Sequence, residues 1–176
     1  TSSPIIPVRR LSLLLALVLA GCGQKDAAPA ATTAATVPAS GPRVIEINAG
    51  VGDQMKYTLP GNAADALIVI DAKVGQEIKI VLTNAGTLPK EVMGHNWVLL
   101  KPGADAAGFA AAASVAKDTD YIPVALKDQV VAHIETLGPR KSGEVTFTPS
   151  APGEYPFLCS FPAHYAVGMK GTLIVK

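Results

Sequence analysis

Three side chains near the C-terminus have the types and spacing of a metal site. Cys159, His164 and Met169 are separated by four residues each, in the order C-x4-H-x4-M. Thiolate, imidazole and thioether are ligands that copper accepts in both of its oxidation states. A second imidazole would complete a plane of two histidines and one cysteine, with methionine as a weak axial ligand. His95, in the segment Met-Gly-His-Asn-Trp at 93–97, is the candidate.

Each of these residues has a more ordinary explanation when it is considered alone. A single cysteine or methionine in a β domain usually fills space in the core. A single histidine is more often a structural or surface residue than a ligand. The combination of all four residues favours copper. His133 has no ligand-type neighbour in its predicted strand and is assigned to the surface, and Trp97 is assigned to the core.

The elements that must position these residues are predicted to be strands. Alternating or continuous apolar runs, most of them separated by Gly and Pro, predict eight strands: 44–48, 66–71, 77–84, 97–100, 130–134, 144–148, 155–158 and 171–175. Short strands in this number indicate an all-β fold, a Greek-key sandwich or barrel. The Ala-rich segment 104–117 predicts one inserted α-helix that ends before Pro123.

Length, charge and cysteine content exclude several classes of protein. The 176 residues fit one domain with tails. A formal net charge of +1, from 15 basic and 14 acidic residues, argues against a general nucleic-acid binder. Two cysteines exclude a disulfide-dense scaffold and a thiolate cluster. With no Ser-His-Asp pattern, second histidine cluster or Gly-rich phosphate loop, the sequence predicts a protein that is not an enzyme.

The N-terminus has the features of an export signal. Arg9 and Arg10 precede an apolar run at 11–20, which is shorter than the roughly 20 residues that span a bilayer. The sequence Leu-Ala-Gly-Cys at 19–22 resembles a bacterial lipobox, in which the cysteine is lipidated. We therefore predict a lipoprotein signal peptide at 1–21 and lipid on Cys22. The alternative is a non-lipid signal that is cut near Gly21.

The next segment is predicted to be a tether. Residues 22–42 comprise the lipidated cysteine and an Ala/Pro/Thr-rich stretch that cannot bury enough apolar surface to fold. The folded domain is predicted at 43–176, where 12 basic and 13 acidic residues give a net charge of −1. The expected location is the periplasmic side of a membrane or the cell surface. Gly23 after Cys22 resembles the signal of outer-membrane lipoproteins.

The upstream histidine segment resembles a known family. Residues 92–99, Val-Met-Gly-His-Asn-Trp-Val-Leu, resemble the azurin branch of the cupredoxins, the type 1 blue-copper proteins, and further similarities occur at 53–55, 88–90, 131–133 and 169–173. The resemblance covers roughly 44–176. Azurins have three residues between the second histidine and the methionine, whereas this chain has four, as in the related membrane-associated auracyanins. It also lacks the azurin disulfide.

The resemblance implies one copper per domain with a defined set of ligands. These are His95, Cys159 and His164, with Met169 on one axial side and the Gly94 carbonyl on the other. The side chain of Asn96 would tie the two ligand loops together. The backbone N–H groups of Asn96 and Phe161 would donate to the cysteine sulfur, which tunes the metal and holds its geometry.

The resemblance also implies a one-electron carrier in the cell envelope. The edge of His164 would be the electron port, and redox partner proteins would dock transiently on an apolar patch around it: Met55, Met93, Pro162, Ala163, Ala166 and Val167. For Met55 and Met93, packing in the core is the competing explanation.

Two other functions are compatible with the same residues. A copper-binding module could buffer or deliver the metal without carrying electrons, and a purely structural surface lipoprotein would bind no copper. A strong visible absorption from thiolate to Cu(II) distinguishes the electron carrier from both.

Overall fold

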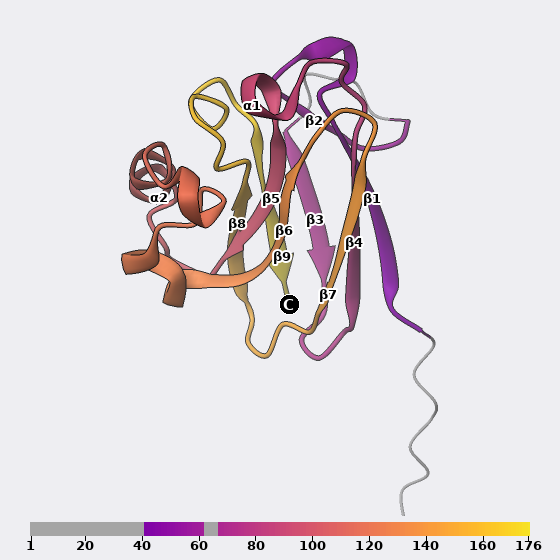
Figure 1. Cartoon of the computed structure of the whole chain (residues 1–176). Helices are drawn as coiled ribbons and strands as arrows, with labels where there is room; N and C mark the ends of the chain where they lie inside the picture. The colour runs from indigo at the N-terminus through magenta and orange to yellow at the C-terminus, as the bar shows by residue number, and fades with distance from the viewer. Residues whose placement is uncertain (1–40, 62–66) are drawn as a thin grey trace, which may run out of the picture. The chain divides into compact units, whose positions relative to one another are not determined.

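The computed structural model describes residues 41–61 and 67–176 of the chain. The predicted signal peptide, the lipid site Cys22 and nearly all of the predicted tether lie outside these residues. The described part is a β-sandwich of two sheets with a few short helices (Figure 1). The predicted all-β fold is therefore confirmed.

The first sheet has four strands in the order β2-β1-β4-β7. Their bounds are Arg43–Ala49 for β1, Tyr57–Thr58 for β2, Ile78–Asn84 for β4 and Ser142–Phe147 for β7. Strand β1 runs parallel to β4, and β4 is antiparallel to β7. Burial alternates along β4, which places Ile78, Ile80 and Leu82 in the core. This period of two is the pattern that predicted the strand.

The second sheet has five strands in the order β3-β9-β8-β5-β6. Their bounds are Ile68–Ala72 for β3, His95–Leu100 for β5, Val130–Leu137 for β6, Gly153–Leu158 for β8 and Lys170–Val175 for β9. The pair β3 and β9 is parallel, and the remaining pairs are antiparallel. Every residue of β5 is buried, because this strand lies between β8 and β6 in the sheet. Its first residue is His95.

The core lies between the two sheets. The indole of Trp97 on β5 is buried between two aromatic rings, with ring centroids 6.0 Å from Phe147 and 5.6 Å from Phe157. Trp97 is thus a core residue, as predicted. His133 is exposed on β6, in agreement with its assignment to the surface.

The predicted helix at 104–117 is too long. The helix α2 covers Ala106–Ala113, and its N-terminus is capped by Asp105, whose carboxylate accepts the N–H groups of Ala107 and Gly108. The chain then enters a 3-10 turn at Lys117–Thr119. High alanine content predicts that a helix forms, but it does not determine where tertiary packing ends it.

Several short elements gave no signal in the sequence. They are the two-residue strand β2, the one-turn helix α1 (Lys90–Met93) and further 3-10 segments at Val51–Asp53 and Val124–Gln129. None of the helices in the described ranges is long and apolar enough to cross a membrane.

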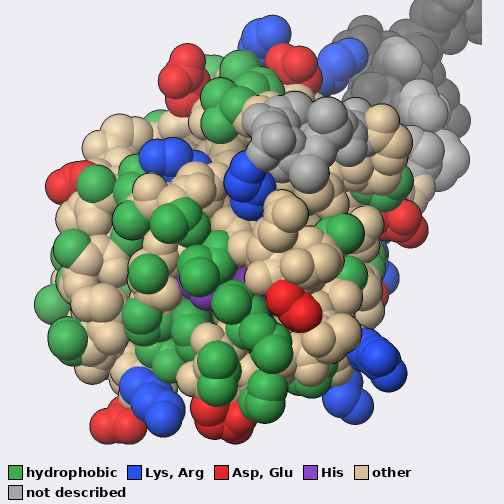
Figure 2. All heavy atoms as spheres, turned by 90° about the horizontal axis from the view of Figure 1, so that it is seen from above, with side chains coloured by type: hydrophobic (Ala, Val, Ile, Leu, Met, Phe, Trp, Pro, Cys, Tyr) green, Lys and Arg blue, Asp and Glu red, His purple; other side chains and the backbone are tan. Residues whose placement is uncertain are grey.

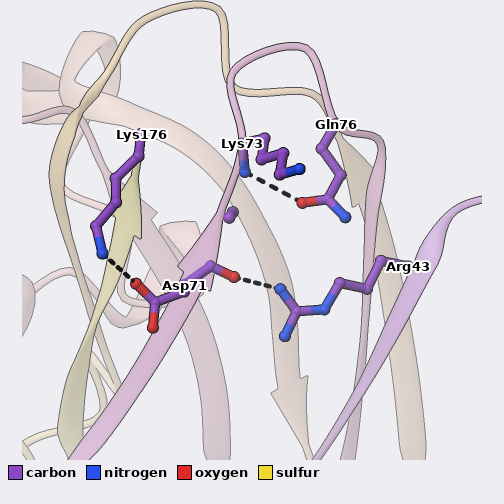
Figure 3. Close-up of a pocket in the computed structure, with 6 residues that line it drawn as sticks. Arg43, Asp71, Lys73, Gln76 and Lys176 are labelled. Carbon is purple, nitrogen blue, oxygen red and sulfur yellow. Dashed lines mark hydrogen bonds and ion pairs between the residues drawn. The ribbon is translucent and has the colours of Figure 1, made fainter.

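The two ends of the sandwich carry different features. Helix α1 and the loop between β8 and β9 lie together at the upper end in Figure 1. A polar pocket lies where β1 begins and the chain ends (Figure 3). There the Arg43 guanidinium donates to the Asp71 carbonyl, and the Lys176 ammonium lies 3.0 Å from the Asp71 carboxylate. Exposed ion pairs of this kind contribute little to stability.

Candidate metal centre

The β8–β9 loop winds three of the predicted ligands toward one point. Cys159 directly follows β8 and Met169 directly precedes β9, and the Cys159 N–H donates to the Met169 carbonyl at 3.0 Å. Between them, the His164 carbonyl accepts the Met169 N–H at 3.0 Å. Gly168 adopts a φ of 101°, a conformation that favours glycine, and this completes the last turn before β9.

The fourth residue arrives from the other side of the site. His95 is the first residue of β5, and the β5–β6 pairing has an irregularity between His95 and Trp97 that re-aims the strand. Gly94 ends α1 immediately before it. A Cβ at Gly94 would lie 2.5 Å from Cγ2 of Thr136 and 2.6 Å from the Lys90 carbonyl oxygen, so the chain passes here only because the residue is glycine.

His95, Cys159 and His164 converge in the structure, and His95 is the imidazole that the sequence offered as a candidate to complete the site. Their ligand atoms all lie within 4.8 Å of one another, and all three side chains are buried. The two Nδ1 atoms are 3.2 Å apart, and the Cys159 Sγ lies 3.4 Å from Nδ1 of His164. Met169, which is fully buried, lies at the end of the same loop. One thiol, two imidazoles and one thioether are the donor set of a mononuclear copper site.

Burial sets the protonation state of these groups before metal binds. It raises the pKa of the Cys159 thiol to about 12, although hydrogen bonds from the backbone N–H groups of Asn96 and Phe161 oppose the rise. It lowers the pKa of His95 to about 4, against the opposing effect of the Asp53 carboxylate.

The second imidazole behaves in the same way. Burial, with a smaller contribution from the nearby His95, lowers the pKa of His164 to about 4. Both imidazoles are therefore neutral at pH 7 and ready to bind metal, whereas the thiol must lose a proton as the metal binds.

Asn96 joins the two segments that carry the ligands. Its side-chain amide donates to the Ser160 hydroxyl at 2.7 Å, and its side-chain oxygen accepts the Ser160 N–H at 2.8 Å. The Tyr57 hydroxyl donates to the Asn96 carbonyl. Sequence reasoning proposed Asn96 but missed Tyr57 and Ser160. Only their proximity in the folded chain links them to the site, and no spacing pattern predicts it.

A glycine supports the far side of the His95 ring. Gly50 has a φ of 69°, and a Cβ at this position would lie 2.5 Å from Nε2 of His95. That Nε2 atom has no hydrogen-bond partner among the described residues. The Gly50 backbone therefore packs directly against the edge of the His95 imidazole. This contact limits how far the ring can tilt away from the metal position.

The surface above the site is apolar. Figure 2, which views this end of the molecule, shows hydrophobic side chains gathered around a small opening where histidine is visible. Ala163, Ala166 and Val167 are exposed there, and Val167 has 53% of its surface accessible. Pro162 is half-buried. The predicted patch members Met55 and Met93 are also half-buried, which leaves part of each side chain accessible.

Comparisons with known proteins agree with this donor set. Residues 44–176 match the family described as copper-binding proteins of the plastocyanin/azurin family. The azurin of Pseudomonas chlororaphis is 42% identical over 113 residues, which is 62% of this chain and 85% of that azurin.

Solved structures show the same relationship. Dithionite-reduced auracyanin from Roseiflexus castenholzii has a TM-score of 0.63 at 35% identity, over 76% of this chain and 96% of auracyanin. Auracyanin A, a "blue" copper protein from Chloroflexus aurantiacus, has a TM-score of 0.62 at 31% identity, over 77% and 100% of the two chains. Copper is thus the metal of the site formed by His95, Cys159, His164 and Met169, and the chain belongs to the plastocyanin/azurin family of copper-binding proteins.

Proposed function

We propose that this protein is a one-electron carrier that uses a type 1 copper site. The observation that carries the proposal is the buried convergence of His95, Cys159 and His164, with Met169 in the same loop. Catalytic metal sites keep one coordination position open for substrate. A site that is filled by protein ligands instead suits electron transfer, so the protein is not expected to be an enzyme.

The chain's own residues limit rearrangement between the two oxidation states. The Asn96–Ser160 hydrogen bonds join the His95 segment to the Cys159 loop, and both lie in a paired β framework. When bound, copper supplies the Cu(I)/Cu(II) couple. The Gly94 carbonyl is proposed as the second axial group, because a residue without a side chain permits close backbone approach.

Electrons would enter and leave through the edge of His164. The exposed side chains of Ala163, Ala166 and Val167 surround this end and carry no charge, and the domain has a net charge near zero. A partner held by such a surface binds through apolar contact and leaves quickly, as redox partners with small interfaces do. Pro162, Met55 and Met93 would complete the patch.

The resemblance of residues 19–22 to a lipobox supports a membrane location for this carrier. Lipid on Cys22 would anchor the chain in the cell envelope, on the periplasmic side of a membrane, with the outer membrane as a candidate because Gly23 follows the cysteine. The segment up to residue 42 would then hold the copper domain away from the bilayer.

A redox titration followed by visible absorption tests the proposal. The purified protein loaded with Cu(II) is expected to show a strong visible band that one electron per copper abolishes and that oxidation restores. A colourless Cu(I) protein that transfers copper to an apo acceptor would support metal delivery instead. Protein that retains no copper after gel filtration would contradict both functions.

A further inference from the structure

Tyr57 buries a hydroxyl group that the ligand set does not require. Its side chain is 4% exposed, and its ring packs against Phe157 with centroids 6.1 Å apart. A phenylalanine would make that packing contact equally well. Burial of a hydroxyl is unfavourable unless it is hydrogen-bonded. The structure satisfies this one at the Asn96 carbonyl, one residue after the His95 ligand.

Asn96 is held by three sets of contacts, and two of them join it to the Cys159 loop. Its backbone N–H donates to the Cys159 sulfur. Its side chain exchanges two hydrogen bonds with Ser160, the residue after that cysteine. The Tyr57 hydroxyl holds the carbonyl. Removal of the hydroxyl would leave the Asn96 carbonyl without this buried partner and would free the residue to move relative to the sulfur.

The backbone N–H of Phe161 also donates to the Cys159 sulfur, so two backbone donors stabilise negative charge on that atom. The single hydroxyl proton of Tyr57 is used at the Asn96 carbonyl. Tyr57 therefore acts on the sulfur through Asn96.

We propose that Tyr57 is a positioning residue that raises the reduction potential of the copper site. Its hydroxyl holds the Asn96 carbonyl and so keeps the Asn96 N–H directed at the Cys159 sulfur. This N–H favours negative charge on sulfur. Because the thiolate gives more of its charge to Cu(II) than to Cu(I), the hydrogen bond stabilises the reduced form. This inference rests on the proposed copper site.

Tyr57→Phe tests the proposal because it removes one oxygen atom and keeps the ring. The variant is expected to remain blue, to show a lower reduction potential in voltammetry and to move its thiolate-to-Cu(II) band to longer wavelength. In the copper-free protein, the Asn96 amide is expected to lose protection from hydrogen exchange. A stronger phenol donor, 3-fluorotyrosine at position 57, is expected to raise the potential.

Tyr155→Phe is the matched control. Tyr155 is also 4% exposed, and its hydroxyl donates to a backbone carbonyl, that of Ala151, at 2.8 Å. It lies at the end of β8 that is remote from Cys159. The control is expected to lose stability while its potential and band stay at the wild-type values. If Tyr57→Phe and Tyr155→Phe change the Asn96 amide protection and the reduction potential alike, the role of Tyr57 is purely structural.

The outcomes separate this inference from the proposed function. A blue Tyr57→Phe protein whose potential equals or exceeds that of the wild type would overturn the role of Tyr57 and leave the electron carrier intact. A wild-type protein that shows no copper band would overturn the proposed function and this inference together.

Discussion

The Nδ1 atoms of His95 and His164 lie 3.2 Å apart, with both rings directed into one buried space. Two imidazolium groups cannot share that space, because each would present an N–H and a positive charge to the other. Burial keeps both rings neutral in the folded apo protein, because it lowers the pKa of each to about 4, and for His164 the nearby His95 adds to this effect. This relationship links the geometry of the site to the pH dependence of the fold.

The apo protein is expected to lose stability as the pH falls from about 6.5 to about 4. In this range the unfolded chain binds protons on His95 and His164 and the folded chain does not, so the free energy of unfolding decreases and levels off below pH 4. The loss is at most about 3 kcal/mol for each imidazole. Urea denaturation at several pH values measures it. The surface variant His133→Gln should keep the dependence, and a flat wild-type profile would contradict the expectation.

Cys159 is expected to supply both the colour of the site and the proton that is released on loading. With the pKa of the thiol raised to about 12, wild-type apo protein at pH 7.5 should release one proton from Cys159 for each Cu(II) bound. Cys159→Ser should bind copper weakly, without colour and without this release. A pH indicator in weak buffer and an absorption spectrum measure the two effects. A serine variant with the full visible band would show that the thiolate assignment is wrong.

Met169 is expected to tune the potential more than it holds the metal, because axial bonds in such sites are long and weak. Met169→Leu removes a soft donor and makes the site drier, which disfavours Cu(II), so the potential should rise while copper and colour persist. Met169→Gln supplies a harder oxygen donor, so the potential should fall. Voltammetry of both variants measures the shifts. If neither potential moves, Met169 is not the effective axial ligand.

Gly50→Ala is expected to weaken copper binding by pressing on the His95 ring. Its Cβ would lie 2.5 Å from Nε2 of that ring. Gly52→Ala is the matched control, because Gly52 also has a positive φ, of 63°, but faces open space. Both variants share a backbone cost of about 1–2 kcal/mol. Beyond that cost, Gly50→Ala alone should lose about tenfold in copper affinity, which corresponds to about 1.4 kcal/mol of binding free energy. Equal affinities in competition titrations would contradict this account.

Cys22 is expected to decide whether the protein partitions with membranes. The wild-type chain, produced in a bacterium that processes lipoproteins, should sediment with the membrane fraction, and Cys22→Ala should be recovered in the supernatant. Mass spectrometry of the wild type should detect the acyl chains. Equal membrane association of the two proteins would contradict the lipoprotein prediction.

Most strands and the ligand residues were predictable because both depend on local chemistry. Alternation along β4 is visible in the sequence, and Cys159, His164 and Met169 are identified by residue type and spacing. The end of α2 was not predictable, since alanine propensity continues through residues that the fold places in a 3-10 turn. The place of Tyr57 beside Asn96 depends on a contact across 39 residues, which no local pattern encodes.

The backbone pairing of β8 and β9 closes the Cys159–Met169 loop at its base, where Leu158 pairs with Lys170 and the Cys159 N–H donates to the Met169 carbonyl. The register of the sandwich is therefore set outside the loop. We therefore expect that residues can be gained or lost between His164 and Met169 without a change in strand pairing, since a glycine with a φ of 101° at position 168 makes the final turn. Loop length can therefore vary independently of the two sheets. We expect a change in loop length alone to change the reduction potential of the copper site while the β-sandwich stays the same.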